Sequence, residues 1–303
     1  MSAKVPPAPF IVANPGSGTT LLRMMLDANS ELAIPPETHF VPELIERARE
    51  IRRGAGRKPT GEELAAVIAG HRRWDDFGLD RDQLAKRMSG VRGEAGARGA
   101  LRAFYSLYAE RQGKSRWGDK TPGYLLSMAR IARTLPEARF VHLVRDGRDV
   151  ALSRRRWRRR AGAPERTIAD WAAQWARWIK VARRQSRRLD HYLEVSYEEL
   201  VADTEQVLRE VCEFADLDFE PDMLAYHERS SERLRELDRS LPAEGAKGAR
   251  EAGHRQAKHA LTSAPPQAAK VEGWRTEMDE ADRAEFERVA GATLAQLGYP
   301  TES

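Results

Sequence analysis

Residues 14–20 read Asn14-Pro15-Gly16-Ser17-Gly18-Thr19-Thr20, a glycine-rich stretch that follows a short apolar run. The run, Pro9-Phe10-Ile11-Val12-Ala13, predicts a buried strand that ends at this Pro/Gly turn. Apolar residues at helical spacing then continue to about Asn29 and predict a helix. A strand, a glycine-rich turn and a helix together are typical of phosphate binding, because backbone N–H groups and the positive helix end converge on the anion.

The side chains of this loop also suit an anionic ligand. Gly16 and Gly18 supply conformational freedom, and hydroxyl donors come from Ser17, Thr19 and Thr20. The ATP-binding pattern G-x-x-x-x-G-K-[ST] is not met, since Thr19 replaces the lysine and the glycines are closer together. An ordinary strand–helix turn, which needs glycine only for its geometry, stays open at this point.

A second anchor for an anion follows another apolar run. Residues 139–144, RFVHLV, predict a strand that runs directly into Arg145. An arginine at the carboxyl end of such a strand points into the crevice where parallel sheets bind ligands. Ser153 follows eight residues later, about two helical turns on. Arg145 can therefore grip a phosphate bidentately while Ser153 approaches it from a helix.

The alternation of strand and helix patterns predicts an α/β fold with a P-loop-type central parallel sheet flanked by helices. Further elements are expected as strands at residues 32–34 and 192–195 and as a last helix at about 277–297. We expect one domain over residues 1–303, with a helical insertion at about 40–112 on the acceptor side. A long, lid-like C-terminal loop is expected at about 230–270, which is polar and contains glycine and proline.

Composition bounds the class of protein. The chain has 303 residues, of which 41% are hydrophobic and 32% charged, and a formal net charge of +5, which suits an anionic ligand. Its single cysteine, Cys212, excludes an intrachain disulfide and lies at a helical spacing that places it in the core. No run approaches the ~20 apolar residues of a membrane span, and no signal peptide is recognisable. We therefore expect a cytoplasmic protein.

Two further patterns are assigned to structure rather than to a ligand. Trp171, Trp175 and Trp178 lie at positions i, i+4 and i+7 of a predicted helix and are expected in the core. The run Arg154–Arg160 is predicted to be a solvated helix face, because Trp157 is its only aromatic residue and the net charge is small. A specific nucleic-acid partner is therefore not expected, although phosphate contacts dominate nucleic-acid affinity.

Taken in order, these motifs resemble the sulfotransferases that use 3′-phosphoadenosine 5′-phosphosulfate (PAPS), and most closely their bacterial and tyrosylprotein-type branch. Residues 17–27, SGTTLLRMMLD, are similar to the family's phosphate loop and helix, which hold the 5′-phosphosulfate. The Arg145 and Ser153 pair is similar to the family's 3′-phosphate site, with Gly147 in place of the common proline. The resemblance extends over nearly the whole chain and implies PAPS as the co-substrate.

The resemblance also implies a reaction. Glu37 lies in IPPETHF, a segment similar to the one that carries the family's catalytic acid, and Lys120 lies in WGDKTP, similar to its lysine-bearing motif. We expect a sulfuryl group to move in line from PAPS to an acceptor hydroxyl, or less favourably to an amine, without a metal. Glu37 is the expected general base, with His39 as the alternative, and Lys120 stabilises charge on the bridging oxygen.

Weaker motifs complete the expected nucleotide site. Tyr197, in SYEEL, corresponds to a family tyrosine near the adenine, and Trp274 with Arg275, in GWR, to the loop that covers the nucleotide. One residue departs from the family pattern, which usually has a basic residue where this chain has Gly16. We expect this departure to affect the rate, and Lys120 to substitute for the missing charge better than Arg23 does.

Two other functions are compatible with the phosphate loop taken alone. A P-loop kinase or other NTPase could use Asp146 for Mg²⁺, but the missing lysine at Thr19 disfavours it. A non-catalytic nucleotide-binding module is suggested by Gly16, whereas Glu37 and Lys120 argue for catalysis. The acceptor class (small molecule, carbohydrate, lipid or peptide) and the oligomeric state stay open at the level of the sequence.

Overall fold

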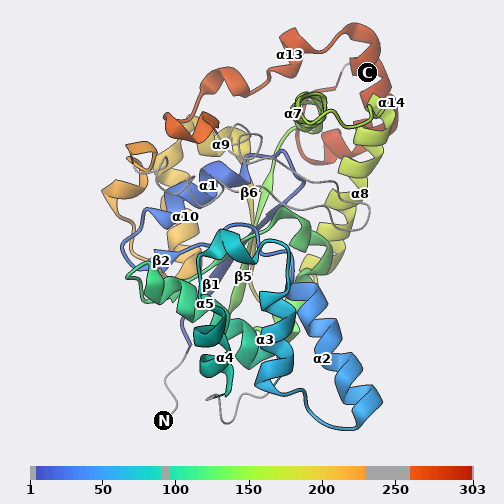
Figure 1. Cartoon of the computed structure of the whole chain (residues 1–303). Coiled ribbons are helices and arrows are strands. Elements are labelled where there is room, and N and C mark those ends of the chain that lie inside the picture. The colour runs from blue at the N-terminus through green and yellow to red at the C-terminus, as the bar shows by residue number, and fades with distance from the viewer. Residues whose placement is uncertain (1–4, 90–95, 229–259, 302–303) are drawn as a thin grey trace.

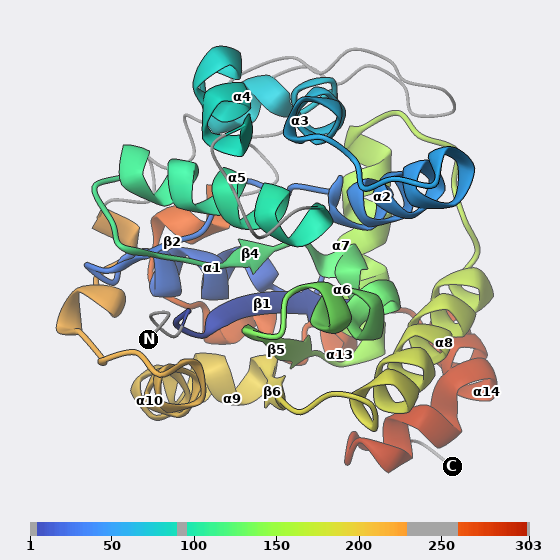
Figure 2. The same cartoon turned by 90° about the horizontal axis from the view of Figure 1, so that it is seen from below.

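The computed structural model describes residues 5–89, 96–228 and 260–301. Four parallel strands form its central sheet, in the order β4 (Asp119–Lys120), β1 (Ala8–Ala13), β5 (Ala138–Val144) and β6 (Tyr192–Ser196). Helices α9 and α10 lie on one side of this sheet, and α2 and α5 on the other (Figures 1 and 2). The predicted α/β class, with a central parallel sheet flanked by helices, is therefore confirmed.

Strand β1 is buried along its whole length, and its side chains alternate between two hydrophobic cores. Phe10 and Val12 belong to the core formed with α2 (Val41–Ala55), α5 (Ala97–Arg111), η2 (Pro122–Ser127) and α6 (Met128–Thr134). Ile11 and Ala13 belong to the core formed with α1 (Thr19–Asp27), α9 (Tyr197–Ala202), α10 (Thr204–Ala215) and η3 (Pro221–Met223). Because both faces are covered, the strand reads as a continuous apolar run rather than an alternating one.

The segment predicted as a helical insertion contains α2, α3 (Gly61–Ala69), the 3-10 turn η1 (Trp74–Phe77), α4 (Arg81–Ser89) and α5. These elements gather on one side of the sheet, drawn from blue to teal in Figure 1. Thr60 precedes α3 and forms a capping box with Glu63. The Thr60 side chain accepts a hydrogen bond from the backbone N–H of Glu63, and the Glu63 side chain accepts one from the backbone N–H of Thr60. Phe40 and Phe77 pack edge-to-face on Phe104, with ring centroids 4.9 and 5.0 Å away.

A third core lies beyond the carboxyl end of β5. It is formed by α7 (Gly147–Arg160), α8 (Ile168–Ser186), α13 (Trp274–Glu277) and α14 (Glu280–Gln296). Helices α8 and α14 lie side by side in both views (Figures 1 and 2). Trp171 and Trp175 are buried in this core, as predicted. Trp178 is half-buried and packs instead against the hydrophobic core that contains Phe10. The 19-residue α8 is long enough to reach both cores, which separates its tryptophans.

Several predicted boundaries change in the structure. The strand expected at 32–34 is β2 (Leu32–Ala33), which pairs with β3 (Arg116–Trp117) in a separate two-stranded sheet. The last helix begins at Glu280 rather than near 277, because the side chain of Asp279 caps it. Of the predicted lid-like loop, residues 230–259 lie outside the described residues. Its last part contains η5 (Ala260–Ser263) and η6 (Ala268–Lys270). Cys212 is buried in α10, as predicted.

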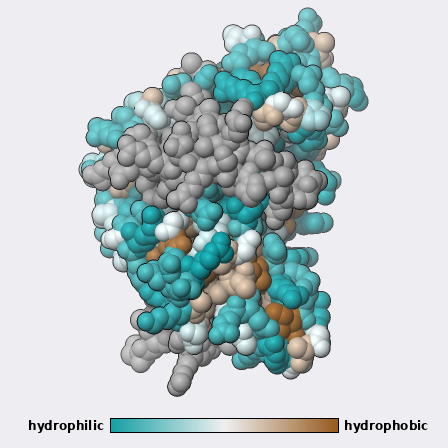
Figure 3. All heavy atoms as spheres, in the orientation of Figure 1, coloured by the Kyte–Doolittle hydropathy of each residue, from teal (hydrophilic) through white to brown (hydrophobic). Residues whose placement is uncertain are grey.

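The face of the molecule shown in Figure 3 is mostly hydrophilic, and its hydrophobic residues form small scattered groups. Among the residues that the structure describes, Leu126 is the exposed large hydrophobic side chain, at 42% of its accessible area. Within the same ranges, no helix combines the length and the apolar character that crossing a membrane requires.

Candidate active site

The predicted phosphate loop connects β1 to α1 at the carboxyl edge of the sheet. Gly16 and Gly18 have φ angles of 108° and 93°, a backbone region that favours glycine. Gly18 is the N-cap of α1, and no side-chain hydrogen bond caps this helix. The first N–H groups of α1 therefore face the loop, where an anion can accept hydrogen bonds from them.

Tyr197 lies directly against this loop. A Cβ atom added at Gly18 would lie 2.4 Å from a ring carbon of Tyr197, so the close approach of the ring requires glycine there. The guanidinium carbon of Arg145 lies 4.3 Å from the centre of the same ring. The structure therefore brings together Gly18, Arg145 and Tyr197, which the sequence places far apart in the chain.

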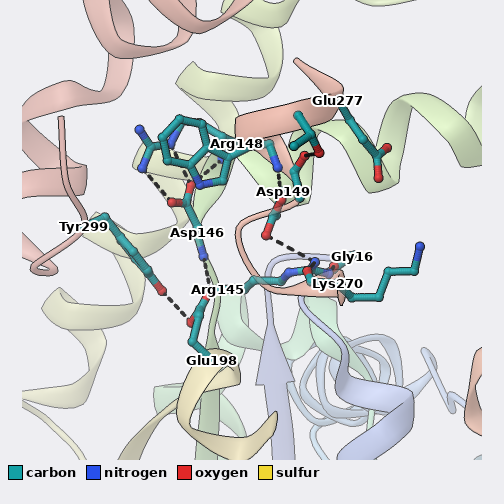
Figure 4. A network of polar contacts seen from close by, with 12 residues as sticks. Gly16, Arg145, Asp146, Arg148, Asp149, Glu198, Lys270, Glu277 and Tyr299 are labelled. Atoms are coloured by element: carbon teal, nitrogen blue, oxygen red, sulfur yellow. Dashed lines mark hydrogen bonds and ion pairs between the residues drawn. The ribbon is translucent and has the colours of Figure 1, made fainter. Parts of the chain in front are cut away.

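Arg145 leaves the end of β5, the strand next to β1, and reaches the loop from the side. One of its amino groups lies 3.4 Å from the carbonyl oxygen of Gly16, and the other donates to the carbonyl oxygen of Lys270 at 2.5 Å (Figure 4). The second group also lies 3.4 Å from an Asp149 carboxylate oxygen. Ser153 is half-buried two turns along α7. The loop, Arg145 and the C-terminal segment thus meet at one point.

The three predicted catalytic residues form one cluster. The Lys120 ammonium donates to Oε1 of Glu37 at 2.8 Å, and Nε2 of His39 lies 2.9 Å from Oε2 of the same carboxylate. His39 adopts φ 56°, which is uncommon for a residue other than glycine. The cluster also contains Arg73, whose amino group lies 3.8 Å from Oε2 of Glu37. Sequence reasoning missed Arg73 because it lies 36 residues away, in the insertion, and no motif marks it.

Lys120 is in β4, with 2% of its area exposed. Burial lowers the pKa of its ammonium group, and the charges of Arg23 and Arg73 act in the same direction, while Glu37 opposes them. Strand β4 pairs with β1 through Lys120 and Ile11. Lys120 therefore reaches the phosphate-loop strand on the side opposite Arg145.

A buried hydrogen-bond network holds Glu37 beside Lys120. The hydroxyl of Thr38 donates to Oδ2 of Asp119 at 2.7 Å, and Tyr105 donates to the same oxygen at 2.8 Å. The Thr38 hydroxyl also lies 2.6 Å from the hydroxyl of Tyr124. Thr38 and Asp119 are the chain neighbours of Glu37 and Lys120. The hydrogen bond between Thr38 and Asp119 therefore holds the two segments that carry Glu37 and Lys120 side by side.

We expect the Asp119→Asn substitution to remove a pH dependence of stability. Burial raises the pKa of Asp119 to about 6 from 3.8, so the folded protein binds this proton more tightly than the unfolded chain. The protonated Asp119 carboxyl therefore contributes its full stabilisation below about pH 4, and this stabilisation is lost as the pH rises through about 6. Relative to the variant, the wild type should lose up to about 3 kcal/mol over this range. Urea unfolding of both proteins between pH 4 and 7.5 measures the difference, and parallel curves would contradict it.

Two residues that follow Arg145, Asp146 and Arg148, pair with each other in the interior of the protein. Arg148 is fully buried, binds both carboxylate oxygens of Asp146 at 3.1 and 2.7 Å, and donates to Glu287 at 2.6 Å. Asp146 also caps α7 by accepting the N–H of Arg148. Its own N–H donates to Glu198, which also accepts from Tyr299 (Figure 4). These contacts hold Asp146 in the interior, whereas Arg145 is the residue of this motif that reaches the loop.

Trp274 and Arg275, predicted in the loop that covers the nucleotide, lie next to this interior network. The Trp274 ring is buried against Arg148, whose guanidinium carbon is 3.5 Å from the ring centre. The backbone N–H of Trp274 donates to Asp149 at 2.8 Å, and Asp149 in turn contacts Arg145. Arg275 pairs with Glu272 at 2.8 Å and is exposed. The described contacts therefore give the ring of Trp274 a packing role.

The basic run on α7 contacts the C-terminal helices as well as solvent. Arg155 pairs with Asp282 at 2.5 Å, and Arg156 pairs with Glu277. The predicted solvated face is thus partly an intramolecular interface, because α13 and α14 carry acidic residues against it. Within the described ranges, no group of His, Cys, Asp and Glu side chains is arranged to hold a metal ion.

Comparison with known sequences identifies a family. The family model described as "Sulfotransferase family" matches residues 7–221, more than half of the chain. The protein-tyrosine sulfotransferase 1 of Danio rerio is 28% identical over 226 residues, which cover 73% of this chain and 56% of that protein. Protein-tyrosine sulfotransferase 2 of Gallus gallus is 28% identical over 231 residues, 75% of this chain and 55% of that protein. The chain spans about half the length of these curated relatives.

Solved structures show the same fold. The sulfotransferase domain from the Curacin biosynthetic pathway superimposes with a TM-score of 0.61 at 22% identity, over 99% of this chain and 100% of that one. The sulfotransferase domain of the Synechococcus PCC 7002 olefin synthase gives a TM-score of 0.56 at 23% identity, over 97% of this chain and 96% of that one. At 22% and 23% identity, this similarity shows a shared fold.

Proposed function

The chain belongs to the sulfotransferase family, and from that premise we propose that it transfers a sulfuryl group from PAPS to an acceptor hydroxyl. One observation carries the proposal. The strand order β4-β1-β5 puts Lys120, with Glu37 bound to it, on one side of the phosphate loop and Arg145 on the other. A phosphosulfate on the loop then has a cation and a carboxylate at its reacting end and an arginine for a further phosphate.

The nucleotide is held by both halves of this site. The N–H groups at the start of α1 and the hydroxyls of Ser17, Thr19 and Thr20 bind the 5′-phosphosulfate. Arg145, with Ser153, binds the 3′-phosphate. In the structure Arg145 donates to the neutral carbonyl of Lys270. A phosphate oxygen replaces that acceptor with a charged one, and charge-assisted hydrogen bonds are the stronger kind.

The reaction is a single displacement at sulfur. The acceptor oxygen forms the new S–O bond as the bond from sulfur to the phosphate oxygen breaks, and 3′-phosphoadenosine 5′-phosphate (PAP) leaves. The phosphosulfate draws Lys120 from Glu37 to the bridging oxygen, whose negative charge it stabilises. Glu37 is then available to take the acceptor proton. His39 and Arg73, which also contact the Glu37 carboxylate, hold it in place for this step.

The acceptor enters from the side of the helical insertion in this proposal. Arg73 lies between α3 and η1 and reaches Glu37, so the insertion borders the proposed base. Phe40, next to His39, is the first buried aromatic residue of that region. A hydroxyl on a peptide, carbohydrate, lipid or small molecule fits this chemistry, and an amine fits it less well because it is protonated at neutral pH.

A P-loop kinase or NTPase is not favoured. The residue that such an enzyme would use for Mg²⁺, Asp146, binds Arg148 with both carboxylate oxygens. The loop also carries Thr19 where the ATP-binding pattern has lysine. A non-catalytic module is disfavoured by the Glu37–Lys120 pair, because the strand that carries Lys120 pairs with β1, which leads into the loop.

Calorimetry with nucleotides tests the proposed ligand. The wild type is expected to bind PAP more tightly than adenosine 5′-phosphate, and Arg145→Ala to lose affinity for PAP by at least about tenfold, because a charged hydrogen bond is removed. Affinity for adenosine 5′-phosphate should change much less. A wild type that prefers ATP with Mg²⁺, or an Arg145→Ala variant with undiminished preference for PAP, would overturn the assignment.

A further inference from the structure

The phosphate loop has no basic side chain of its own between Asn14 and Thr20. Any positively charged side chain at the loop therefore comes from another element of the fold. Arg145 reaches the carbonyl oxygen of Gly16, but it is also bound to Asp149 and to the carbonyl of Lys270. Lys120 is bound to Glu37 on the far side of the loop strand.

A second arginine lies on the loop at the same residue. A Cβ atom at Gly16 would lie 3.4 Å from both Cγ and Cδ of Arg154, and 3.5 Å from the carbonyl oxygen of Val150. Val150 and Arg154, four residues apart on one face of α7, therefore cover Gly16. The aliphatic stem of Arg154 occupies the direction in which a side chain at position 16 would leave the loop.

The head group of Arg154 lies beside two aromatic side chains. Its guanidinium carbon lies 5.0 Å from the ring centre of Trp157 and 5.4 Å from that of Trp171. The next two residues of α7, Arg155 and Arg156, pair with carboxylates of the C-terminal helices. Arg154 is the residue of this basic run whose stem lies on the loop in the described contacts.

From this arrangement we infer that Arg154 supplies the phosphate loop with the positive charge that position 16 lacks, and binds the 5′-phosphosulfate of the donor. The inference rests on the proposed function. Gly16, at φ 108°, cannot carry a long side chain without backbone strain. An arginine from α7 avoids that strain. Its fork can bind two oxygens of the phosphosulfate, as guanidinium groups do with phosphates.

Arg154→Met tests the charge while keeping an aliphatic stem over Gly16. We expect this variant to bind adenosine 5′-phosphosulfate, which has no 3′-phosphate, about tenfold to a hundredfold more weakly than the wild type does. PAP should lose affinity by a similar factor, because its 5′-phosphate occupies the same place. Arg154→Lys should retain part of the affinity. The control Arg158→Ala, at a half-buried residue of the same helix whose side chain donates to the Pro164 carbonyl, should bind as the wild type does.

Isothermal titration calorimetry of the folded proteins separates the possible outcomes. Wild-type affinity in Arg154→Met would overturn the inference, because the side chain would then only pack on Gly16. Equal losses in Arg154→Met and Arg158→Ala would also overturn it, since the effect would then be one of net charge. A wild type that binds PAP while Arg154→Met binds it equally well leaves the proposed function intact. A wild type that binds neither nucleotide overturns both.

Discussion

Replacing Glu37 with glutamine is expected to lower turnover at least about 100-fold, the usual scale for loss of a general base. Glutamine keeps the shape of the side chain and can still accept the hydrogen bond that Lys120 donates at 2.8 Å, but it cannot take the acceptor proton. Nucleotide binding should not weaken, because a negative charge is removed near an anionic ligand. Initial rates of sulfuryl transfer from PAPS to a phenolic test acceptor, together with calorimetry using PAP, measure the two effects.

Two variants make this result specific. Glu50→Gln removes an exposed carboxylate of α2 that pairs with Arg47, and should leave turnover unchanged. His39→Asn removes the alternative base and should cost less than Glu37→Gln, since the imidazole contacts Glu37 and supports its position. Near-normal turnover in Glu37→Gln with a large loss in His39→Asn would transfer the role of base to the histidine.

Arg148→Met is expected to lower the free energy of unfolding by about 3–5 kcal/mol, the range for breaking a buried ion pair. The substitution leaves the carboxylates of Asp146 and Glu287 in the interior without the cation that both contact. It also removes the guanidinium that stacks on Trp274 at 3.5 Å. Urea unfolding monitored by tryptophan fluorescence gives the difference in stability.

The matched control for Arg148 lies on α14, next to Glu287. Arg288→Met removes an exposed arginine that pairs with Glu285 at 2.8 Å, and surface pairs of this kind contribute about 0–1 kcal/mol. If Arg148→Met fails to accumulate in folded form, Arg148→Lys should give a measurable, smaller loss, because lysine keeps the charge but not the bidentate contact. A loss for Arg148→Met as small as that for Arg288→Met would contradict the role assigned to the buried cluster.

Short-range patterns were sufficient for the elements that carry the phosphate loop. The apolar run before Asn14 and the run before Arg145 predicted β1 and β5 to within a residue at either end. Gly16 and Gly18 marked the turn between β1 and α1, because their backbone has φ values that other residues rarely adopt. These features depend on neighbours in the chain, so the sequence displays them directly.

The residues that act on the loop from elsewhere were visible from the sequence only through family motifs, or not at all. Lys120 lies in β4, a strand of two residues, which is too short to show a hydrophobic periodicity in the sequence. Only its pairing with β1 in the folded protein identifies this segment as a strand. Arg148 and Arg145 occupy one motif, yet one faces the interior and the other the loop.

Arg73 and Arg154 reach the proposed site from two different parts of the chain, the helical insertion and α7. No local pattern distinguishes them from the many other arginines. The composition and periodicity of the chain determined a parallel α/β sheet with an anion-binding turn. Which cations meet at that turn was decided by the order of the strands and the packing of α7, because contacts between distant segments depend on positions in space that no local sequence pattern encodes.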